Sequence, residues 1–185
     1  MYGIINKSIE ALVKSTFGED KWVLIKERSQ IDIDYFISND TYDDAITYKL
    51  AIAISEEMKI SLEDVLFTFG EWWIIKTTNE KYAGLMKSGG ENLKDFLENL
   101  PSFHNHIMLL YPKLTPPEFK VSHLLENSIH IHYHSKREGL EYFVKGLLSG
   151  LGKLFDTSVL IETLESRNEG DHHEVFKVIW NDNAQ

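Results

Sequence analysis

The spacing of apolar side chains changes in the last third of this chain, and this change limits the folds open to it. Up to about residue 111, apolar residues recur three or four positions apart, a spacing typical of amphipathic helices. Residues 129–135 instead alternate in twos, and residues 159–166 and 174–180 also have the character of strands. A long helical stretch, residues 137–157, lies between them. Helices followed by strands that enclose one helix predict an α+β fold with an antiparallel sheet.

Turn-forming residues divide the helical part into segments. We expect one of its helices to begin at Asp43 or Asp44, and Ser61 with Asp64 resembles a capping box. Three prolines in residues 111–119 forbid a regular helix and predict an extended linker. The predicted helices of this part, of which the last is interrupted by Pro101, cover residues 5–17, 18–29, 43–58, 61–78 and 91–111.

The length of 185 residues predicts one domain, residues 1–185. Within it we expect a helical N-terminal subdomain over about residues 1–60 and an α+β subdomain over about residues 61–185. The net charge of −10 argues against a nucleic-acid partner, which needs clustered Lys and Arg, and against an anionic membrane surface.

The chain has no cysteine, which excludes disulfides, thiolate metal sites and cysteine nucleophiles. No window approaches the roughly 18 apolar residues of a membrane-spanning helix, and the N-terminus lacks a long apolar signal core. We therefore expect a soluble cytoplasmic protein.

His130, His132 and His134 stand at alternate positions of a predicted strand and therefore share one face. Three imidazoles could bind zinc or copper. However, the outer two lie about 13 Å apart on a straight strand, at roughly 3.3 Å per residue, which is too far for one ion with bonds of about 2.1 Å. We therefore favour a solvated polar face over a metal site.

The opposite face of that strand is apolar and ends in polar groups. It carries Ile129, Ile131, Tyr133 and Ser135, and Arg137 follows in phase. An arginine fork pairs with carboxylates, and hydroxyls can donate alongside it. A flat apolar ligand with carboxylates at one edge would suit this face. Periodicity alone favours a simpler interpretation, a half-buried strand that ends at a surface arginine.

His104 lies on the apolar stripe of the predicted helix 91–111, because it follows Leu100 by four residues and precedes Ile107 by three. His106 faces away, since two residues correspond to a rotation of about 200°. A histidine on an apolar face is usually a hydrogen-bonded core residue, but a neutral imidazole there can also bind haem iron. His104 and the strand face that would suit a ligand with carboxylates together describe a haem pocket.

Several fragments, taken in order, resemble the haem nitric oxide/oxygen-binding (H-NOX) family, the domain shared by bacterial gas sensors and the β subunit of soluble guanylate cyclase. The resemblance covers nearly the whole chain and implies a haem buried between the N-terminal helical lobe and the C-terminal sheet. The fragments are MYGIINKSIEALV, FGEWW, LPSFHNHIMLLYPKLTPPEF, the Tyr-x-Ser-x-Arg run that begins at Tyr133, and REGLEYFVKGLLSGLGKLF.

The resemblance implies roles for individual residues around haem b (iron protoporphyrin IX). The proximal iron ligand would be His104. The clamp on the haem propionates would consist of Tyr133, Ser135 and Arg137. Ile5 matches an apolar residue packed against the ring, and Pro117 matches a proline that distorts the porphyrin. Trp73 matches a distal aromatic residue.

The resemblance also implies the gas that binds. Oxygen-binding members carry a distal tyrosine whose hydroxyl stabilises dioxygen. When the chain is aligned on Gly146, Phe143 takes that position, and a phenyl ring cannot donate a hydrogen bond. The implied ligands are therefore nitric oxide and carbon monoxide, and not oxygen. If Tyr142 were the distal residue, oxygen binding would be implied instead.

In nitric-oxide-sensing relatives, ligand binding breaks the bond between iron and histidine, and strain imposed through the residue that matches Pro117 can relax. The ligand then re-weights two conformations that differ in affinity for a partner. Bacterial relatives pair with a separate histidine kinase or diguanylate cyclase. We expect this chain to act on such a partner in trans.

The remaining motifs indicate structure. No Ser–His–Asp arrangement or paired carboxylates stand out, so we do not expect an enzyme. The helical glycines Gly146, Gly150 and Gly152 predict close packing against the ring or the sheet, and EGDHHE predicts a solvated turn. A haem-based gas sensor is the leading hypothesis. A non-haem, histidine-rich metalloprotein and a cofactor-free interaction adaptor stay open as alternatives.

Overall fold

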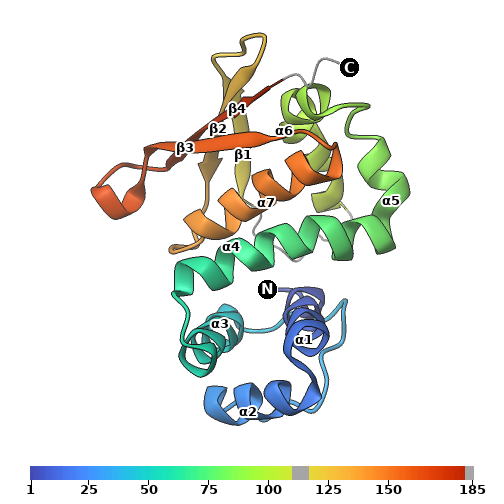
Figure 1. Ribbon diagram of the computed structural model, residues 1–185, viewed down its shortest axis with the longest axis vertical. Helices are drawn as coiled ribbons and strands as arrows, with labels where there is room; N and C mark the ends of the chain where they lie inside the picture. Colours follow the sequence, from blue (N-terminus) through green and yellow to red (C-terminus); the bar gives the residue numbers. More distant parts are fainter. Residues whose placement is uncertain (110–116, 182–185) are drawn as a thin grey trace. The chain divides into compact units, whose positions relative to one another are not determined.

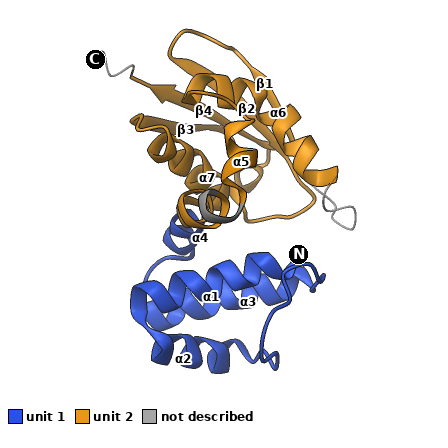
Figure 2. Cartoon of the chain, turned by 90° about the vertical axis from the view of Figure 1, so that its right-hand side faces the viewer, with its two compact units in different colours: residues 1–69 blue, residues 70–185 orange. Residues whose placement is uncertain are grey.

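The computed structural model describes residues 1–109 and 117–181, without the side chains of residues 79–81 (Figure 1). These residues form two compact units, Met1–Phe69 and Gly70–Gln185 (Figure 2). The sequence analysis expected a division near residue 60. In the structure the boundary falls between Phe69 and Gly70, within helix α4 (Leu62–Trp72).

Packed helices make up the first unit: α1 (Gly3–Phe17), α2 (Glu19–Ser29), α3 (Asp44–Met58) and the first turns of α4. The first three pack on one another and bury apolar side chains such as Val13, Ile25 and Leu50. The Asp43 side chain accepts a hydrogen bond from the Ala45 N–H at 2.8 Å, which confirms the predicted start of α3.

The helices of the second unit begin with a change of geometry. Helix α4 continues directly into a π-helix, η1 (Trp73–Thr78), and then into α5 (Asn79–Lys87). The sequence predicted a helix over residues 61–78 but neither the π geometry nor α5. Helix α6 (Leu93–Leu109) follows and continues through Pro101, because its buried apolar face holds the helix in place on both sides of the proline. Within residues 1–109 and 117–181, no helix combines the length and the apolar character needed to span a membrane.

Four antiparallel strands form the sheet: β1 (Glu118–Ser122), β2 (Ser128–His134), β3 (Val159–Glu165) and β4 (Glu174–Trp180). Their order across the sheet is β1-β2-β4-β3 (Figure 1). Helix α7 (Glu141–Leu154) connects β2 to β3. The sequence missed β1, whose first residues it assigned to the linker over residues 111–119. Residues 110–116 of that linker lie outside the described residues.

The strand registers place the large apolar side chains of the sheet on one face. Tyr133 of β2 stands opposite Phe119 of β1, and Ile131 stands opposite Phe176 of β4. Helices α6 and α7 pack against this face and complete a core of buried side chains that includes Phe96, Leu97 and Leu148. The other face of β2 carries His130, His132 and His134, as the alternation predicted.

Candidate functional site

His104 is partly buried and has an unsatisfied ring nitrogen. It lies on α6, and its Nδ1 atom is buried without a hydrogen-bond partner among the residues that the structure describes. Burial lowers the pKa of the imidazole to about 4, because the charged form would lose its hydration. The ring is therefore neutral at pH 7 and keeps a lone pair for a metal. His106 is exposed, and its Nδ1 lies 3.0 Å from the Ser102 carbonyl oxygen on the same helix.

The ring of Phe119 connects His104 to Tyr133. Its centroid lies 4.9 Å from that of the His104 ring, in an edge-on arrangement, and 5.3 Å from that of Tyr133. The predicted iron ligand and the first residue of the predicted clamp thus belong to one aromatic cluster. Phe119 was not among the site residues predicted from the sequence. The apolar alternation of Phe119 and Val121 in a short strand was the signal that could have revealed it.

The predicted clamp residues lie at and just beyond the end of β2. Tyr133 is buried, and burial raises the pKa of its phenol, while a hydrogen bond with Ser135 acts in the opposite direction. The Ser135 hydroxyl accepts a hydrogen bond from the Arg137 backbone N–H at 3.0 Å. A local turn therefore connects Tyr133, Ser135 and Arg137 through hydrogen bonds.

A second arginine contacts this turn from the β3–β4 connection. Arg167 begins the short helix η2 (Arg167–Glu169), and its Nη1 and Nη2 donate to the carbonyl oxygens of Ser135 and Arg137, both at 2.8 Å. Its Nε donates to the buried carboxylate of Glu174, also at 2.8 Å. Sequence analysis identified neither Arg167 nor Glu174, because no local spacing links residues 135–137 to this hairpin.

Two other predicted contacts of the ring lie in different units. Pro117 is partly buried and directly precedes β1, two residues before Phe119. The two-residue period of a strand places it in phase with Phe119. Ile5 belongs to α1 in the first unit, where it is partly buried. Its contact with the ring stays a prediction.

Helix α7 lies very close to the helical segment of residues 70–74. A Cβ atom added to Gly70 would lie 2.3 Å from the Phe143 carbonyl oxygen, and one added to Gly150 would lie 2.9 Å from the Ile74 Cβ. Gly150 therefore packs against this helical segment, where the sequence analysis had expected the ring or the sheet. The expectation holds for Gly152, because a Cβ there would lie 2.9 Å from Val159, the first residue of β3.

Tyr142 and Phe143 have different surroundings on α7. Tyr142 is 37% exposed, and the Lys145 Nζ lies 4.7 Å from the centroid of its ring. Phe143 is partly buried and shares a helix face with Gly146 and Gly150. That face packs against the segment that leads into η1, where Trp73, also partly buried, is the first residue.

The histidines on the outer face of the sheet pack on one another. The His132 Nε2 lies 2.7 Å from the Ser122 hydroxyl, and its Nδ1 lies 3.1 Å from the Nε2 of His173. The His134 ring stacks on that of His173 with centroids 4.0 Å apart. Parallel stacked rings do not direct their lone pairs at one point, and within the described part of the chain no three His, Asp or Glu side chains are placed to hold a metal ion. The sequence predicted a solvated polar face here, and His130, His132 and His134 are all partly exposed.

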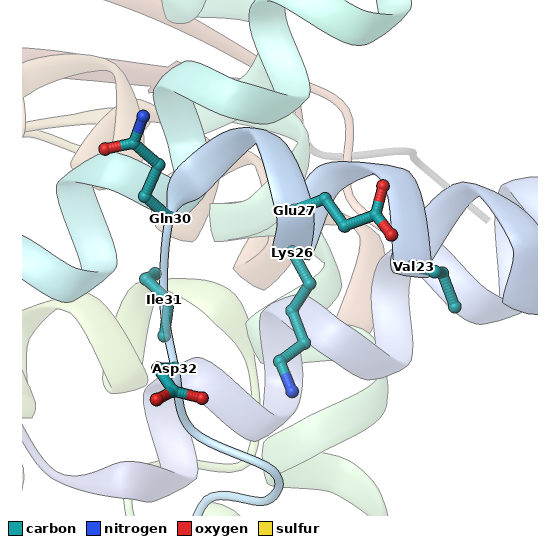
Figure 3. Close-up of a pocket in the computed structure, with 6 residues that line it drawn as sticks. All are labelled: Val23, Lys26, Glu27, Gln30, Ile31 and Asp32. Carbon is teal, nitrogen blue, oxygen red and sulfur yellow. The ribbon is translucent and has the colours of Figure 1, made fainter.

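A surface hollow of about 470 Å³ lies in the first unit (Figure 3). The charged ends of Lys26, Glu27 and Asp32 do not converge on a common point within it (Figure 3). None of the predicted site residues lines it, and it has no aromatic side chain to face a flat cofactor. Its lining consists of Val23, Lys26, Glu27, Gln30, Ile31 and Asp32.

A family model described as haem-NO-binding matches residues 2–163. The chain belongs to this haem-NO-binding family. It is 30% identical to the soluble guanylate cyclase gcy-32 of Caenorhabditis elegans, over 94% of this chain and 26% of that protein. It is 31% identical to the guanylate cyclase soluble subunit beta-2 of Rattus norvegicus, over 64% of this chain and 18% of that protein. The chain spans about a quarter or less of the length of these two relatives.

Solved structures confirm the fold of this haem-NO-binding domain. An H-NOX protein from S. oneidensis in the Fe(II)NO state superposes with a TM-score of 0.88 at 18% identity, over 98% of this chain and all of the other. A variant H-NOX protein from K. algicida in the unliganded Fe(II) state superposes with a TM-score of 0.83 at 26% identity, over 100% of this chain and 98% of the other. The predicted α+β class is therefore correct.

The family assignment makes the chain a haem-binding domain of a gas-sensor family, and the matched region is a sensor domain rather than a catalytic one. The side chains at the site suit such a cofactor. The imidazole of His104 is neutral, and its buried Nδ1 has no hydrogen-bond partner among the described residues, which makes it a suitable ligand for iron. The hydroxyl and guanidinium groups of Tyr133, Ser135 and Arg137 are donors that suit the carboxylates of a haem.

Proposed function

We propose that this domain senses nitric oxide, and also binds carbon monoxide, at a ferrous haem b, that it does not bind oxygen, and that it regulates a separate signalling partner. The observation that carries the gas preference is the contrast between two neighbours on α7. Tyr142 is exposed beneath Lys145, whereas Phe143 lies on the face that packs against residues 70–74. This contrast supports Phe143 as the distal residue.

A phenyl ring at the distal position disfavours oxygen for a chemical reason. Bound dioxygen carries partial negative charge, and a hydrogen-bond donor in the distal pocket stabilises it. Phe143 has no donor, and the hydroxyl of Tyr142 lies on a different side of the helix, about 100° away. Nitric oxide and carbon monoxide bind ferrous iron without such help, so they remain the proposed ligands.

The chain would hold the haem from its second unit. His104 would bind the iron, and Tyr133, Ser135 and Arg137 would hold the propionates. Pro117 would press on the ring, and Ile5 and Trp73 would contact it from the first unit and from η1. When bound, the haem supplies a ferrous iron with one coordination position open to a diatomic gas.

The imidazole of His104 can transmit the state of the ligand to the protein. It contacts Phe119 edge-on, and Phe119 lies on β1 and in contact with Tyr133. A movement of the His104 ring therefore disturbs packing at the edge of the sheet. Two arrangements of these rings with different affinities for a partner would be re-weighted by the gas, within the limit of its differential affinity for the two.

We extend the proposal to the class of partner, a histidine kinase or a diguanylate cyclase acting as a separate chain. The resemblance to bacterial gas sensors of the family supports it. The curated relatives are named as guanylate cyclases, and the matched region makes up about a quarter of each, so they support a signalling role and not this class of partner. Kinase or cyclase activity should change when the haem-loaded chain is exposed to nitric oxide. If the activity of the kinase or cyclase does not change with nitric oxide, that enzyme is excluded as the partner.

Absorption spectra of the purified chain test the gas preference directly. Protein produced with a sufficient supply of haem should be coloured, and its reduced form should change spectrum under nitric oxide and under carbon monoxide. Under oxygen it should oxidise without forming a stable complex. A stable oxygen complex would contradict the assignment of Phe143, and protein that takes up no haem even after reconstitution would contradict the proposed function.

A further inference from the structure

We propose that Arg167 is a positioning residue of the haem clamp, which holds the backbone of residues 135–137 so that the clamp side chains meet the propionates. The inference rests on the proposed function, because it assigns Arg167 a part in haem binding. Arg167 itself acts through other residues. Its guanidinium is occupied by the protein and touches the clamp only at main-chain oxygens.

The geometry of Arg167 is that of a three-way brace. Its two terminal nitrogens donate to the carbonyl oxygens of Ser135 and Arg137, and its Nε donates to Glu174, each at 2.8 Å. A guanidinium is planar and offers its donors in a fixed fork. Three short bonds in fixed directions therefore determine where the two carbonyl groups lie, and with them the directions of the Ser135 and Arg137 side chains.

The partner of this brace is buried. Glu174 is 3% exposed, and it stands opposite Tyr133 in the pairing of β2 with β4. Its Oε2 atom is buried without a partner among the described residues. The ion pair between Arg167 and Oε1 therefore offsets the cost of burying this carboxylate. A buried ion pair costs far more to break than a surface pair, because the remaining charge stays in a poorly hydrated place. The brace is therefore a fixed part of the structure.

Residues next to Arg167 attach the same turn to α7. The hydroxyl of Ser166 donates to the Glu141 carboxylate at 2.7 Å, and the Asn168 side chain donates to it at 3.3 Å. Glu141 is the first residue of α7, two positions before Phe143. The hairpin turn thus connects the proposed clamp with the start of the helix that carries the proposed distal residue.

Loss of haem to an excess of a haem-accepting apoprotein tests the inference. The variant Arg167→Lys keeps a positive charge but cannot reach all three acceptors, and we expect haem to leave about tenfold faster, as for the loss of one strong hydrogen bond. The control is Arg28→Lys, which alters a 46%-exposed arginine that pairs with Glu56 and Glu57 in the first unit. Its haem loss should equal that of the unchanged chain.

A double-mutant cycle separates positioning from a general loss of stability. If Arg167 acts through the Arg137 side chain, the combination of Arg137→Ala with Arg167→Lys should lose haem no faster than Arg137→Ala alone. Fully additive effects would overturn the inference, because they would mean that Arg167 acts independently of the clamp. Should Arg167→Lys fail to fold, the pair Arg167→Gln with Glu174→Gln removes the brace without stranding a buried charge, and the same acceleration is expected.

Hydrogen exchange of the haem-free chain gives a readout that does not depend on haem. Peptides that cover residues 135–138 should exchange at least several-fold faster in Arg167→Lys, while peptides from α1 should not change. Unchanged exchange at residues 135–138 together with unchanged haem loss would overturn the role of Arg167. Failure of the unchanged chain to take up haem would overturn the proposed function, and the exchange result would still report on the brace.

Discussion

His104 differs from the other histidines, because its Nδ1 atom is buried and has no hydrogen-bond partner among the described residues. We predict that His104→Gly removes the axial ligand and changes the absorption spectrum of the haem-loaded protein, and that millimolar imidazole restores it. His106→Gly is the matched control, because it places the same flexible residue in the same helix, at a histidine that is exposed. If His104→Gly left the spectrum unchanged, His104 would be excluded as the iron ligand.

A second prediction at the residue scale concerns the gas. Phe143→Tyr should add a distal hydroxyl and give the ferrous protein a measurable oxygen affinity, at least about tenfold above that of the unchanged chain, as expected for one hydrogen bond to a charged acceptor. Tyr142→Phe, which removes the exposed hydroxyl beneath Lys145, should leave gas binding as it was. Oxygen titrations followed by absorbance measure both. If Tyr142→Phe lowered oxygen affinity and Phe143→Tyr left it unchanged, Tyr142 would be the distal residue.

Among the structural elements, α7 and residues 70–74 come very close together, and glycine makes this possible. Gly150→Ala would bring a methyl group to 2.9 Å from the Ile74 Cβ and 3.2 Å from the Glu71 Cα, so the two elements must separate. We predict a loss of about 1–3 kcal/mol in the free energy of unfolding. Gly84→Ala in α5, where no described residue lies within 4 Å of the added atom, should leave stability unchanged or slightly raised. Urea denaturation compares them, and equal stabilities would contradict the close packing.

Some elements could be predicted from the sequence and others could not, and the reasons are physical. The strand that contains Tyr133 and the helix that contains His104 were predictable, because burial on one side imposes a period on the apolar residues. Strand β1 left only a weak signal, the alternation of Phe119 and Val121, because its five residues follow directly on a run of prolines. The π geometry of η1 leaves no pattern, because it depends on how residues 73–78 pack and not on their hydrophobicity.

On the scale of the whole molecule, sequence periodicity assigned a face to each site residue but could not bring the faces together. The contact of His104 with Phe119 depends on the packing of α6 against β1, and the brace from Arg167 depends on the β3–β4 connection returning to the end of β2. Such pairings join distant parts of the chain. The family resemblance supplied the proposed set of haem contacts. Arg167 and Glu174 belong to no motif, and their contacts are seen only in the three-dimensional structure.

The stacked histidines of the sheet predict how the stability of the whole molecule depends on pH. Burial, together with neighbouring His173, lowers the pKa of both His132 and His134, and for His132 the carboxylate of Glu165 acts in the opposite direction. The unfolded chain, with histidine pKa values near 6.5, then binds more protons than the folded chain below that pH. Stability should therefore fall as the pH drops through 6.5, by about 1.4 kcal/mol per pH unit for each extra proton that the unfolded chain binds.

The variant His132→Gln with His134→Gln tests this dependence, because it removes two of these imidazoles and should flatten the fall in stability between pH 7 and pH 5. His172→Gln, at an exposed histidine of the neighbouring turn, is the matched control and should keep the slope of the unchanged chain. The comparison uses urea denaturation of the haem-free forms at each pH, and His104, present in all of them, contributes equally to every slope. A slope in the double variant as steep as that of the unchanged chain would mean that the acid sensitivity arises elsewhere, with the imidazole of His104 as the next group to examine.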